Sequence, residues 1–393
     1  MKDFREIAFD TNKDKIAIVV VGYNRINSLI TLFNSLLQAE YPSVDIPLVI
    51  SIDNSGDEKL YEYVRNFDWP NGEKYVNIQE SRLGLKNHIF QCGDLTHYFK
   101  AVIILEDDSY VAPYFYDYVC QAVNCYGDDS LICGISLYVS HNNEYVNIPF
   151  LPINDGNDVF LLQDVQTRGE CFTAQMWSKF RLWLLANEGR DFLNVSMPER
   201  IKSWSRAWSK YYYAYMIESK TTFLYPYRSF VTNMGAVGEH SSRVTNVAQV
   251  DLEWGKRTYN MPLLSLITRY DAFYCNEAIY GMLQMSEDEL CLDYYGFNPN
   301  ILGKRFVLTY RPLPYKIVRS FGLKLYPVEM NIKLDIKGDA LKLYDTRQPV
   351  AKKGRVSFET IQYIYCKHNV KLMFNYLCGW FKNAIKYKLH LIK

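Results

Sequence analysis

With 393 residues, an apolar fraction of 49% and a net charge of +1, the chain is predicted to fold into roughly two to three globular domains. The balanced total charge gives no global reason to expect nucleic acid as a partner. The nine cysteines show no CxxC or Cys/His spacing, which argues against a disulfide framework or a zinc site and favours a reduced, cytoplasmic setting. The N-terminus lacks the apolar core of a signal peptide, and no run reaches the ~18 apolar residues of a spanning helix. We therefore expect neither secretion nor a transmembrane segment.

The N-terminal part alternates strand and helix patterns. The predicted order is β-α-β-α-β, over residues 15–22, 28–37, 46–52, 58–66 and 75–79. Polar residues follow the first two strands, with Tyr23 and Arg25 after one and Asp53 after the other. Such alternation predicts a mostly parallel, Rossmann-like sheet with a crevice at the carboxyl ends of its strands. No GxGxxG follows the first strand, which argues against a dinucleotide-binding loop.

Residues 101–105 form an apolar, β-branched run that ends in three consecutive carboxylates, Glu106, Asp107 and Asp108. Acidic groups this close repel one another unless a cation or hydrogen-bond donors offset their charge, and a hard divalent metal is the simplest partner. The alternative is an acidic strand-to-helix turn in which an Asp caps the helix.

Four stretches in this order resemble the nucleotide-sugar-binding half of GT-A glycosyltransferases: GYNR, IDNSG, RLGLKNH at residues 82–88, and ILEDDSYVAPYFYDYV at residues 104–119. The last is similar to the N-acetylglucosaminyltransferase I family and its bacterial relatives (family-2-like). The resemblance covers about residues 15–245. It implies an α/β GT-A fold with a mixed, mostly parallel sheet flanked by helices over residues 1–255, and an α+β extension over residues 256–393. The donor half would be about 15–125 and the acceptor half about 126–255.

The resemblance also implies roles for single residues. Asp108 would bind Mn²⁺ or Mg²⁺ at the donor diphosphate, with Glu106 and Asp107 holding the ribose, the sugar or metal-bound water. Arg25 would approach the diphosphate, and Asp53 would contact the uracil. The remaining donor-side candidates are Tyr23, Arg82 and either Asn87 or His88, the last two at a ribose-contacting position. His240 would contact phosphate or metal, or serve as a structural histidine.

The acceptor half lacks one expected residue. The order Trp204, Trp208, Pro226, Asn233 and His240 is that of the family, but no acid lies between the two tryptophans. An inverting transferase needs a general base within reach of the acceptor hydroxyl. The candidates are Glu170, which we favour, and Asp191, Glu199 and Glu239. Helices are predicted at residues 174–185 and 211–217.

The C-terminal extension is predicted to hold a helix at 271–293 and strands at 306–310, 316–319 and 330–337. Residues 351–393 carry nine Lys and Arg against one acid, Glu359. Their last part would form a basic amphipathic helix that either lies on the inner face of an anionic membrane or docks on the catalytic domain.

The leading hypothesis is a metal-dependent, inverting hexosyltransferase that moves a sugar, GlcNAc being one candidate, from a UDP-sugar to a saccharide or lipid-linked saccharide. Its setting would be bacterial surface-glycan synthesis, such as capsule or O-antigen. The alternatives are a nucleotidyltransferase and a catalytically silent protein that binds sugar nucleotides or glycans.

Overall fold

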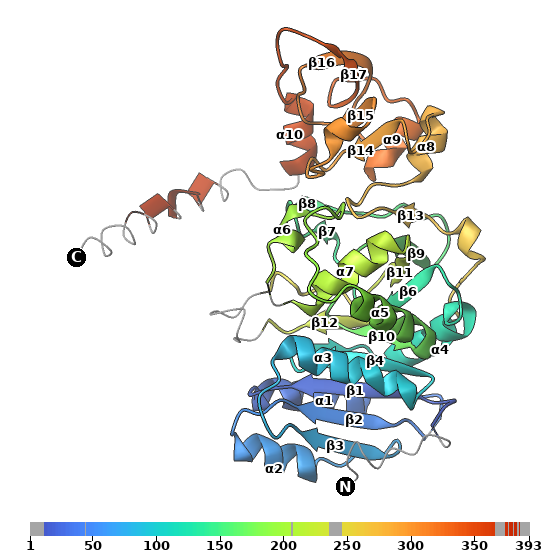
Figure 1. Ribbon diagram of the computed structural model, residues 1–393, viewed down its shortest axis with the longest axis vertical. Helices are drawn as coiled ribbons and strands as arrows, with labels where there is room; N and C mark the ends of the chain where they lie inside the picture. Colours follow the sequence, from blue (N-terminus) through green and yellow to red (C-terminus); the bar gives the residue numbers. More distant parts are fainter. Residues whose placement is uncertain are drawn as a thin grey trace.

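The computed structural model describes residues 12–365 apart from 44, 206 and 236–245, together with a few positions between 374 and 385. A nine-stranded sheet and its helices form most of the molecule, and a smaller four-stranded sheet lies at one end of the long axis (Figure 1).

The N-terminal strands form the parallel part of the large sheet. They are β1 (Ile16–Gly22), β2 (Leu48–Ile52), β3 (Lys74–Ile78) and β4 (Ala101–Glu106), in the spatial order β3-β2-β1-β4. The connecting helices are α1 (Ile26–Gln38), α2 (Glu58–Asn66) and α3 (Leu85–Asp94), which continues into the 3₁₀ turn η2 (Leu95–His97). These elements confirm the predicted β-α-β-α-β order.

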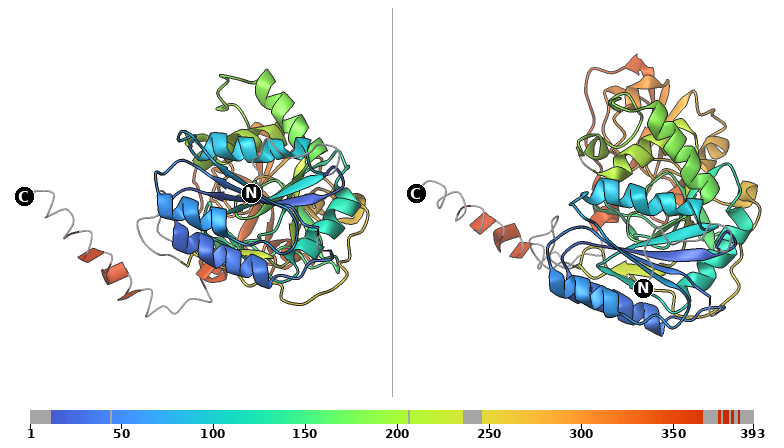
Figure 2. Two further views of the ribbon diagram at one scale, coloured as in Figure 1. Left: turned by 90° about the horizontal axis from the view of Figure 1, so that it is seen from below. Right: turned by 60° about the horizontal axis from the view of Figure 1, so that its bottom comes forward.

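The sheet is covered on both faces because alternate residues of each strand point to opposite sides. Ala17, Val19 and Val21 of β1 pack in one core with α3, whereas Ile16, Ile18 and Val20 pack in another with α1 and α2. Figure 2 shows the helices on the two sides of the sheet.

The sheet continues beyond β4 with mixed directions. The strand β10 (Glu170–Thr173) lies antiparallel between β4 and β6 (Ile132–Ser136), and next come β11 (Thr222–Pro226), β9 (Val159–Leu162) and β13 (Arg269–Tyr270). The helices of this part are α4 (Phe115–Tyr126), α5 (Ala174–Ala186), α6 (Glu199–Lys202) and α7 (Trp208–Glu218). Two short ribbons pair β5 (Ser109–Val111) with β12 (Val231–Asn233), and β7 (Asn142–Asn143) with β8 (Ile148–Pro149). The mixed, mostly parallel sheet flanked by helices is therefore confirmed.

The C-terminal extension is α+β, as predicted. Its sheet has the order β14-β15-β17-β16, formed by β14 (Leu290–Asp293), β15 (Phe306–Thr309), β17 (Leu341–Pro349) and β16 (Tyr315–Phe321). The helices are α8 (Ala278–Leu283), α9 (Val328–Lys333) and α10 (Phe358–Tyr365), with 3₁₀ turns η3 (Leu264–Leu266) and η4 (Ile301–Gly303). Buried Glu329 joins this part to the large sheet, because its Oε1 accepts hydrogen bonds from Tyr270 Oη at 2.6 Å and Asn276 Nδ2 at 3.1 Å. A domain boundary near residue 255 stays a prediction.

Two predicted elements are wrong. The expected helix at 271–293 contains only α8, because Gln284 takes a left-handed conformation (φ 55°) that ends the helix and residues 290–293 then pair as β14. The expected strand at 330–337 is instead α9, in which Val328 and Ile332 share the buried side at helical spacing. The side chain of Asn331 bonds backbone groups of residues 324, 325 and 328 and holds this turn in place.

Within the described residues, no helix is long and apolar enough to cross a lipid bilayer. The predicted amphipathic helix at the C-terminus lies largely outside the described residues.

Candidate functional site

The strand order reverses at β1 and β4, so their carboxyl ends mark the place where a crevice is predicted. From β1 the chain proceeds to β2 and β3 on one side and then crosses to β4 on the other side of β1. In open α/β sheets, ligands bind outside the carboxyl ends of the strands where the order reverses in this way. The register brings the predicted residues to this point, because Val21 of β1 lies opposite Glu106 of β4.

Arg25 joins the two strand ends by pairing with two of the three acids. Its Nη1 lies 2.9 Å from Asp108 Oδ2, its Nε donates to Asp107 Oδ2 at 3.2 Å, and its Nη2 pairs with Asp107 Oδ1. Burial opposes the charge of Arg25, but the bonds and charges of Asp107 and Asp108 outweigh it and raise the pKa of the guanidinium. Arg25 therefore contacts the acidic cluster, defined as Glu106, Asp107 and Asp108, through two of its three members.

The acidic cluster carries more carboxyl groups than the single guanidinium of Arg25 can neutralise. Burial, with the charges of Asp108 and Asp107 added, raises the pKa of Glu106 to about 8. Burial likewise raises the pKa of Asp107 to about 6, although its bonds with Arg25 act in the opposite direction. Carboxyl groups whose pKa values are raised in this way gain stability from an added cation.

Of the three acids in the cluster, Asp108 is the best candidate for a metal ligand. Its Oδ1 is buried and has no hydrogen-bond partner among the described residues, while Oδ2 pairs with Arg25. A hydrogen bond from Met234 N to Asp108 O at 2.7 Å holds the Asp108 backbone in place. It joins the residue before β5 to the residue after β12. Mg²⁺ and Mn²⁺ prefer oxygen donors, and Mg²⁺ commonly takes one or two carboxylates and completes its shell with substrate phosphate and water. The residues present fit such an ion. In the described part of the chain, no group of three or more His, Cys, Asp and Glu forms a complete protein cage for a metal.

Glu170 lies beside this cluster inside the sheet. It begins β10 opposite Ile104 of β4 and Ser136 of β6, so its side chain shares a face with Glu106. The side chain is fully buried, and neither carboxylate oxygen has a hydrogen-bond partner within the described ranges. Burial, followed by the charge of Glu106, raises its pKa well above the ordinary value.

Arg168 is a charged residue at this edge that the sequence analysis did not single out. Its Nη1 lies 2.9 Å from Glu144 Oε1, and its guanidinium lies 5.0 Å from the ring centre of Tyr138. Gly169 follows with φ 92°, where a Cβ would stand 2.9 Å from Val231 Cγ2, so the close turn into β10 requires glycine. Because β10 runs antiparallel to β4, the start of β10 lies beside the carboxyl end of β4. The sequence does not show the direction of so short a strand.

Asp53 holds the loop that leads into α3. Its Oδ1 accepts hydrogen bonds from Asn54 N at 2.9 Å and Leu83 N at 2.8 Å, and its Oδ2 accepts one from Gly84 N at 2.9 Å. The predicted acid after β2 therefore lies at the crevice edge, and its carboxylate orders residues 83 and 84 there.

Asn87 and His88 occupy different environments. Asn87 is exposed in the first turn of α3 and donates to Leu83 O at 3.3 Å. His88 is buried, its Nε2 lies 2.7 Å from Ser51 Oγ, and burial lowers its pKa to about 4. Of the two, only Asn87 is accessible to a ligand in this conformation.

Tyr23 and Arg82 meet across the loops after β1 and β3. The Arg82 guanidinium lies 4.6 Å from the ring centre of Tyr23. Of the other candidates, Asp191 lies on an exposed loop, where its Oδ1 accepts a hydrogen bond from Leu193 N at 3.2 Å. Exposed Glu199 pairs with Lys202 at 3.0 Å. Glu239 and His240 lie outside the described residues.

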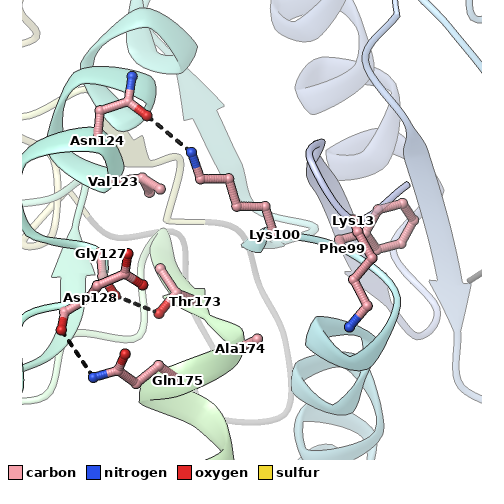
Figure 3. A pocket seen from close by; sticks show the side chains of 10 residues that line it. All are labelled: Lys13, Phe99, Lys100, Val123, Asn124, Gly127, Asp128, Thr173, Ala174 and Gln175. Carbon is pink, nitrogen blue, oxygen red and sulfur yellow. Dashed lines mark hydrogen bonds between the residues drawn. The ribbon is translucent and has the colours of Figure 1, made fainter. Parts of the chain in front are cut away.

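Two pockets lie away from the acidic cluster. One, of about 290 Å³, lies at the amino-terminal end of β4, beside Lys100 and the start of α5. There Lys100 Nζ donates to Asn124 Oδ1 at 3.1 Å (Figure 3). The other, of about 720 Å³, lies in the helix layer between α3 and α5 and includes Phe90, Arg181 and Tyr211. Neither contains the residues of the acidic cluster.

Comparison with known proteins yields distant structural likeness only. No protein-family model matches the chain, and no curated protein matches it. Similar solved structures include S. aureus TarS residues 1–349 (16% identity, TM-score 0.34, covering 55% of this chain and 59% of that one). Others are the mannosyltransferase PcManGT from Pyrobaculum calidifontis with GDP-Man and Mn²⁺ (13%, 0.31, 49% and 51%) and GalNAc-T7 with UDP, GalNAc and Mn²⁺ (14%, 0.38, 56% and 43%). The chain thus spans well under two thirds of each. Likeness at this level carries no argument about activity, and membership of the N-acetylglucosaminyltransferase I family stays a prediction.

Proposed function

We propose that this protein is a metal-dependent GT-A glycosyltransferase that transfers a sugar from a UDP-sugar to a saccharide acceptor. The observation that carries the proposal is the convergence of Arg25, Asp107 and Asp108 where the strand order reverses, with one buried oxygen of Asp108 unpartnered among the described residues. A divalent cation and a diphosphate supply the opposite charges that these groups require.

Asp108 would hold the Mn²⁺ or Mg²⁺ ion, and Glu106 and Asp107 would support its position through water or the donor sugar. The ion, when bound, stabilises the negative charge that develops on the leaving diphosphate. Arg25 shifts from the carboxylates toward a phosphate oxygen, since a guanidinium binds phosphate and carboxylate with the same paired geometry.

The nucleoside lies over the ends of β1, β2 and β3. Asp53 orders residues 83 and 84 through backbone hydrogen bonds, and together with Asn87 these form the base and ribose side of the crevice. The Arg82 guanidinium stacks on the Tyr23 ring at the same side of the crevice.

Glu170 is our candidate for the general base of an inverting reaction. Of the predicted bases that the structure describes, it is the one at the crevice, and burial moves its pKa in the direction that a base active near neutral pH needs. Deprotonated Glu170 would take the proton of the acceptor hydroxyl as that oxygen attacks the sugar carbon and the nucleoside diphosphate leaves.

The finer assignments rest on the sequence resemblance. GlcNAc as the sugar, a saccharide or lipid-linked saccharide acceptor, and a role in bacterial surface-glycan synthesis belong to this level. Deep burial of Glu170 and the lack of an acid between Trp204 and Trp208 favour one alternative, a silent protein that binds the sugar nucleotide without transfer.

A binding measurement followed by turnover tests the proposal. Calorimetry with UDP should show heat of binding that requires Mn²⁺ and is lost in Asp108→Ala. A panel of UDP- and GDP-sugars should then show Mn²⁺-dependent release of the nucleotide from at least one UDP-sugar. Binding without hydrolysis or transfer would support the silent alternative, and no metal-dependent binding of any donor would contradict both.

A further inference from the structure

Charge is divided unevenly along the chain. Residues 301–393 carry 19 Lys and Arg against 5 Asp and Glu, whereas residues 1–300 carry 25 against 38. The near-neutral total therefore hides a basic C-terminal quarter and an acidic remainder. Such asymmetry within one chain is typical of attachment to a polyanionic surface.

The basic part lies at one end of the molecule. Residues 301–365, all described, carry 13 Lys and Arg against 5 Asp and Glu. They form β15, β16, β17, α9 and α10, at the opposite end of the long axis from β3 and α2 (Figure 1). A negatively charged surface attracts this end and repels the acidic remainder, so it orients the whole molecule.

Residues 350–361, the basic–apolar segment, comprise the connection from β17 to α10 and the first turn of α10, and they combine charge with exposed apolar groups. Lys352, Lys353 and Arg355 are exposed. The apolar side chains beside them are also exposed: Phe358 at 77%, Ile361 at 46%, Val350 at 42% and Val356 at 38%.

The segment is held in place from beneath. Thr360 Oγ1 donates to Ala340 O at 3.1 Å, and Tyr363 Oη donates to Leu325 O at 3.0 Å. These bonds fix the inner side of α10 against the residue before β17 and the connection between β16 and α9, whereas Phe358 and Ile361 are exposed.

We propose that the basic–apolar segment docks the protein on an anionic lipid surface. Lys352, Lys353 and Arg355 would lie among anionic headgroups, and the Phe358 and Ile361 side chains would enter the apolar boundary below them. A single-stranded nucleic acid would use the same positive charges and stack its bases on Phe358, but it has no use for the exposed aliphatic Val350, Val356 and Ile361, so we favour lipid. This inference does not rest on the proposed function, because it uses no residue of the crevice.

Co-sedimentation of the full chain with vesicles tests the proposal. We expect binding to vesicles of phosphatidylglycerol mixed with phosphatidylcholine, weakening as salt rises, and little binding to phosphatidylcholine alone. The combined change Lys352→Gln, Lys353→Gln, Arg355→Gln should lower the partition coefficient by about 100-fold. Phe358→Ser should lower it by about tenfold without altering the salt dependence.

A matched variant controls for total charge. Lys59→Gln, Arg65→Gln, Lys179→Gln removes the same charge from exposed positions on α2 and α5, and should leave vesicle binding within about twofold. Equal loss in both triple variants, or full binding by Phe358→Ser, would overturn the proposal. So would single-stranded RNA that binds more tightly than the vesicles, whether or not it responds to Phe358→Ser. Circular dichroism confirms that each variant is folded.

Discussion

Arg25 Nη1 lies 2.9 Å from Asp108 Oδ2, so a guanidinium from the end of β1 partly neutralises the predicted metal ligand at the end of β4. A metal ion at Asp108 would therefore compete with Arg25 for the same carboxylate. On the proposed function, binding of a diphosphate would resolve the competition, because phosphate oxygens offer Arg25 another partner.

Arg25→Gln should change two affinities in opposite directions. Without the guanidinium, Mn²⁺ alone binds more tightly, by roughly tenfold, because the cluster is more negative. UDP in saturating Mn²⁺ binds more weakly, by about tenfold or more, since a charge-assisted bond to the diphosphate is lost. Calorimetry measures both, and a parallel loss or gain of the two affinities would contradict the competition.

Asp53→Asn should loosen the loop before α3. Asp53 accepts hydrogen bonds from three backbone N–H groups, and an amide has only one oxygen to offer them. We expect the free energy of unfolding to fall by about 1–3 kcal/mol and UDP affinity to fall with it. Asp57→Asn is the control, because Asp57 caps α2 and asparagine caps equally well. Urea unfolding that shows the same change for both variants would exclude the role given to Asp53.

His88 should make the protein sensitive to acid. Burial lowers its pKa from 6.5 to about 4, so between these pH values the unfolded chain binds more protons than the folded one. Its stabilising contribution is complete above pH 6.5 and is lost as the pH falls toward 4, by on the order of 3 kcal/mol. His88→Gln keeps a donor near Ser51 and does not titrate, so its unfolding free energy should fall less over this range. Parallel pH profiles of the two proteins would show that His88 is not the cause.

Glu170→Gln separates catalysis from packing. The amide resembles the protonated carboxyl that burial favours, so stability at neutral pH should change little. If Glu170 is the base, kcat should fall by about 10²–10⁴-fold with donor affinity preserved. The wild-type rate should also rise with pH, because a raised pKa keeps Glu170 protonated at lower pH. Full turnover by the variant would remove Glu170 from the mechanism.

The arrangement of residues at the carboxyl ends of β1, β2 and β4 was predictable because its sequence signals are local. Buried runs at residues 16–22, 48–52 and 101–106 each end in polar residues, and parallel pairing brings those ends together. The proximity of Arg25 to Asp107 and Asp108 follows from that geometry.

The positions of other residues depend on strand pairings and side-chain contacts that the sequence does not show. Arg168 and Glu170 reach the crevice because β10 runs antiparallel to β4, and a strand of four residues carries no mark of its direction. The alternation in residues 330–337 predicted a strand, but the side-chain bonds of Asn331 hold the start of this stretch in α9. The inward position of His88 likewise depends on Ser51, which lies 37 residues earlier.

The most direct test is Mn²⁺-dependent release of UDP from UDP-sugars by the wild type and Asp108→Asn, with Asp117→Asn on α4 as the matched control. We expect turnover of at least one UDP-sugar that chelation abolishes, a loss of roughly 100-fold or more in Asp108→Asn, and normal rates in Asp117→Asn. Metal-independent turnover, or turnover that Asp108→Asn leaves unchanged, would contradict it.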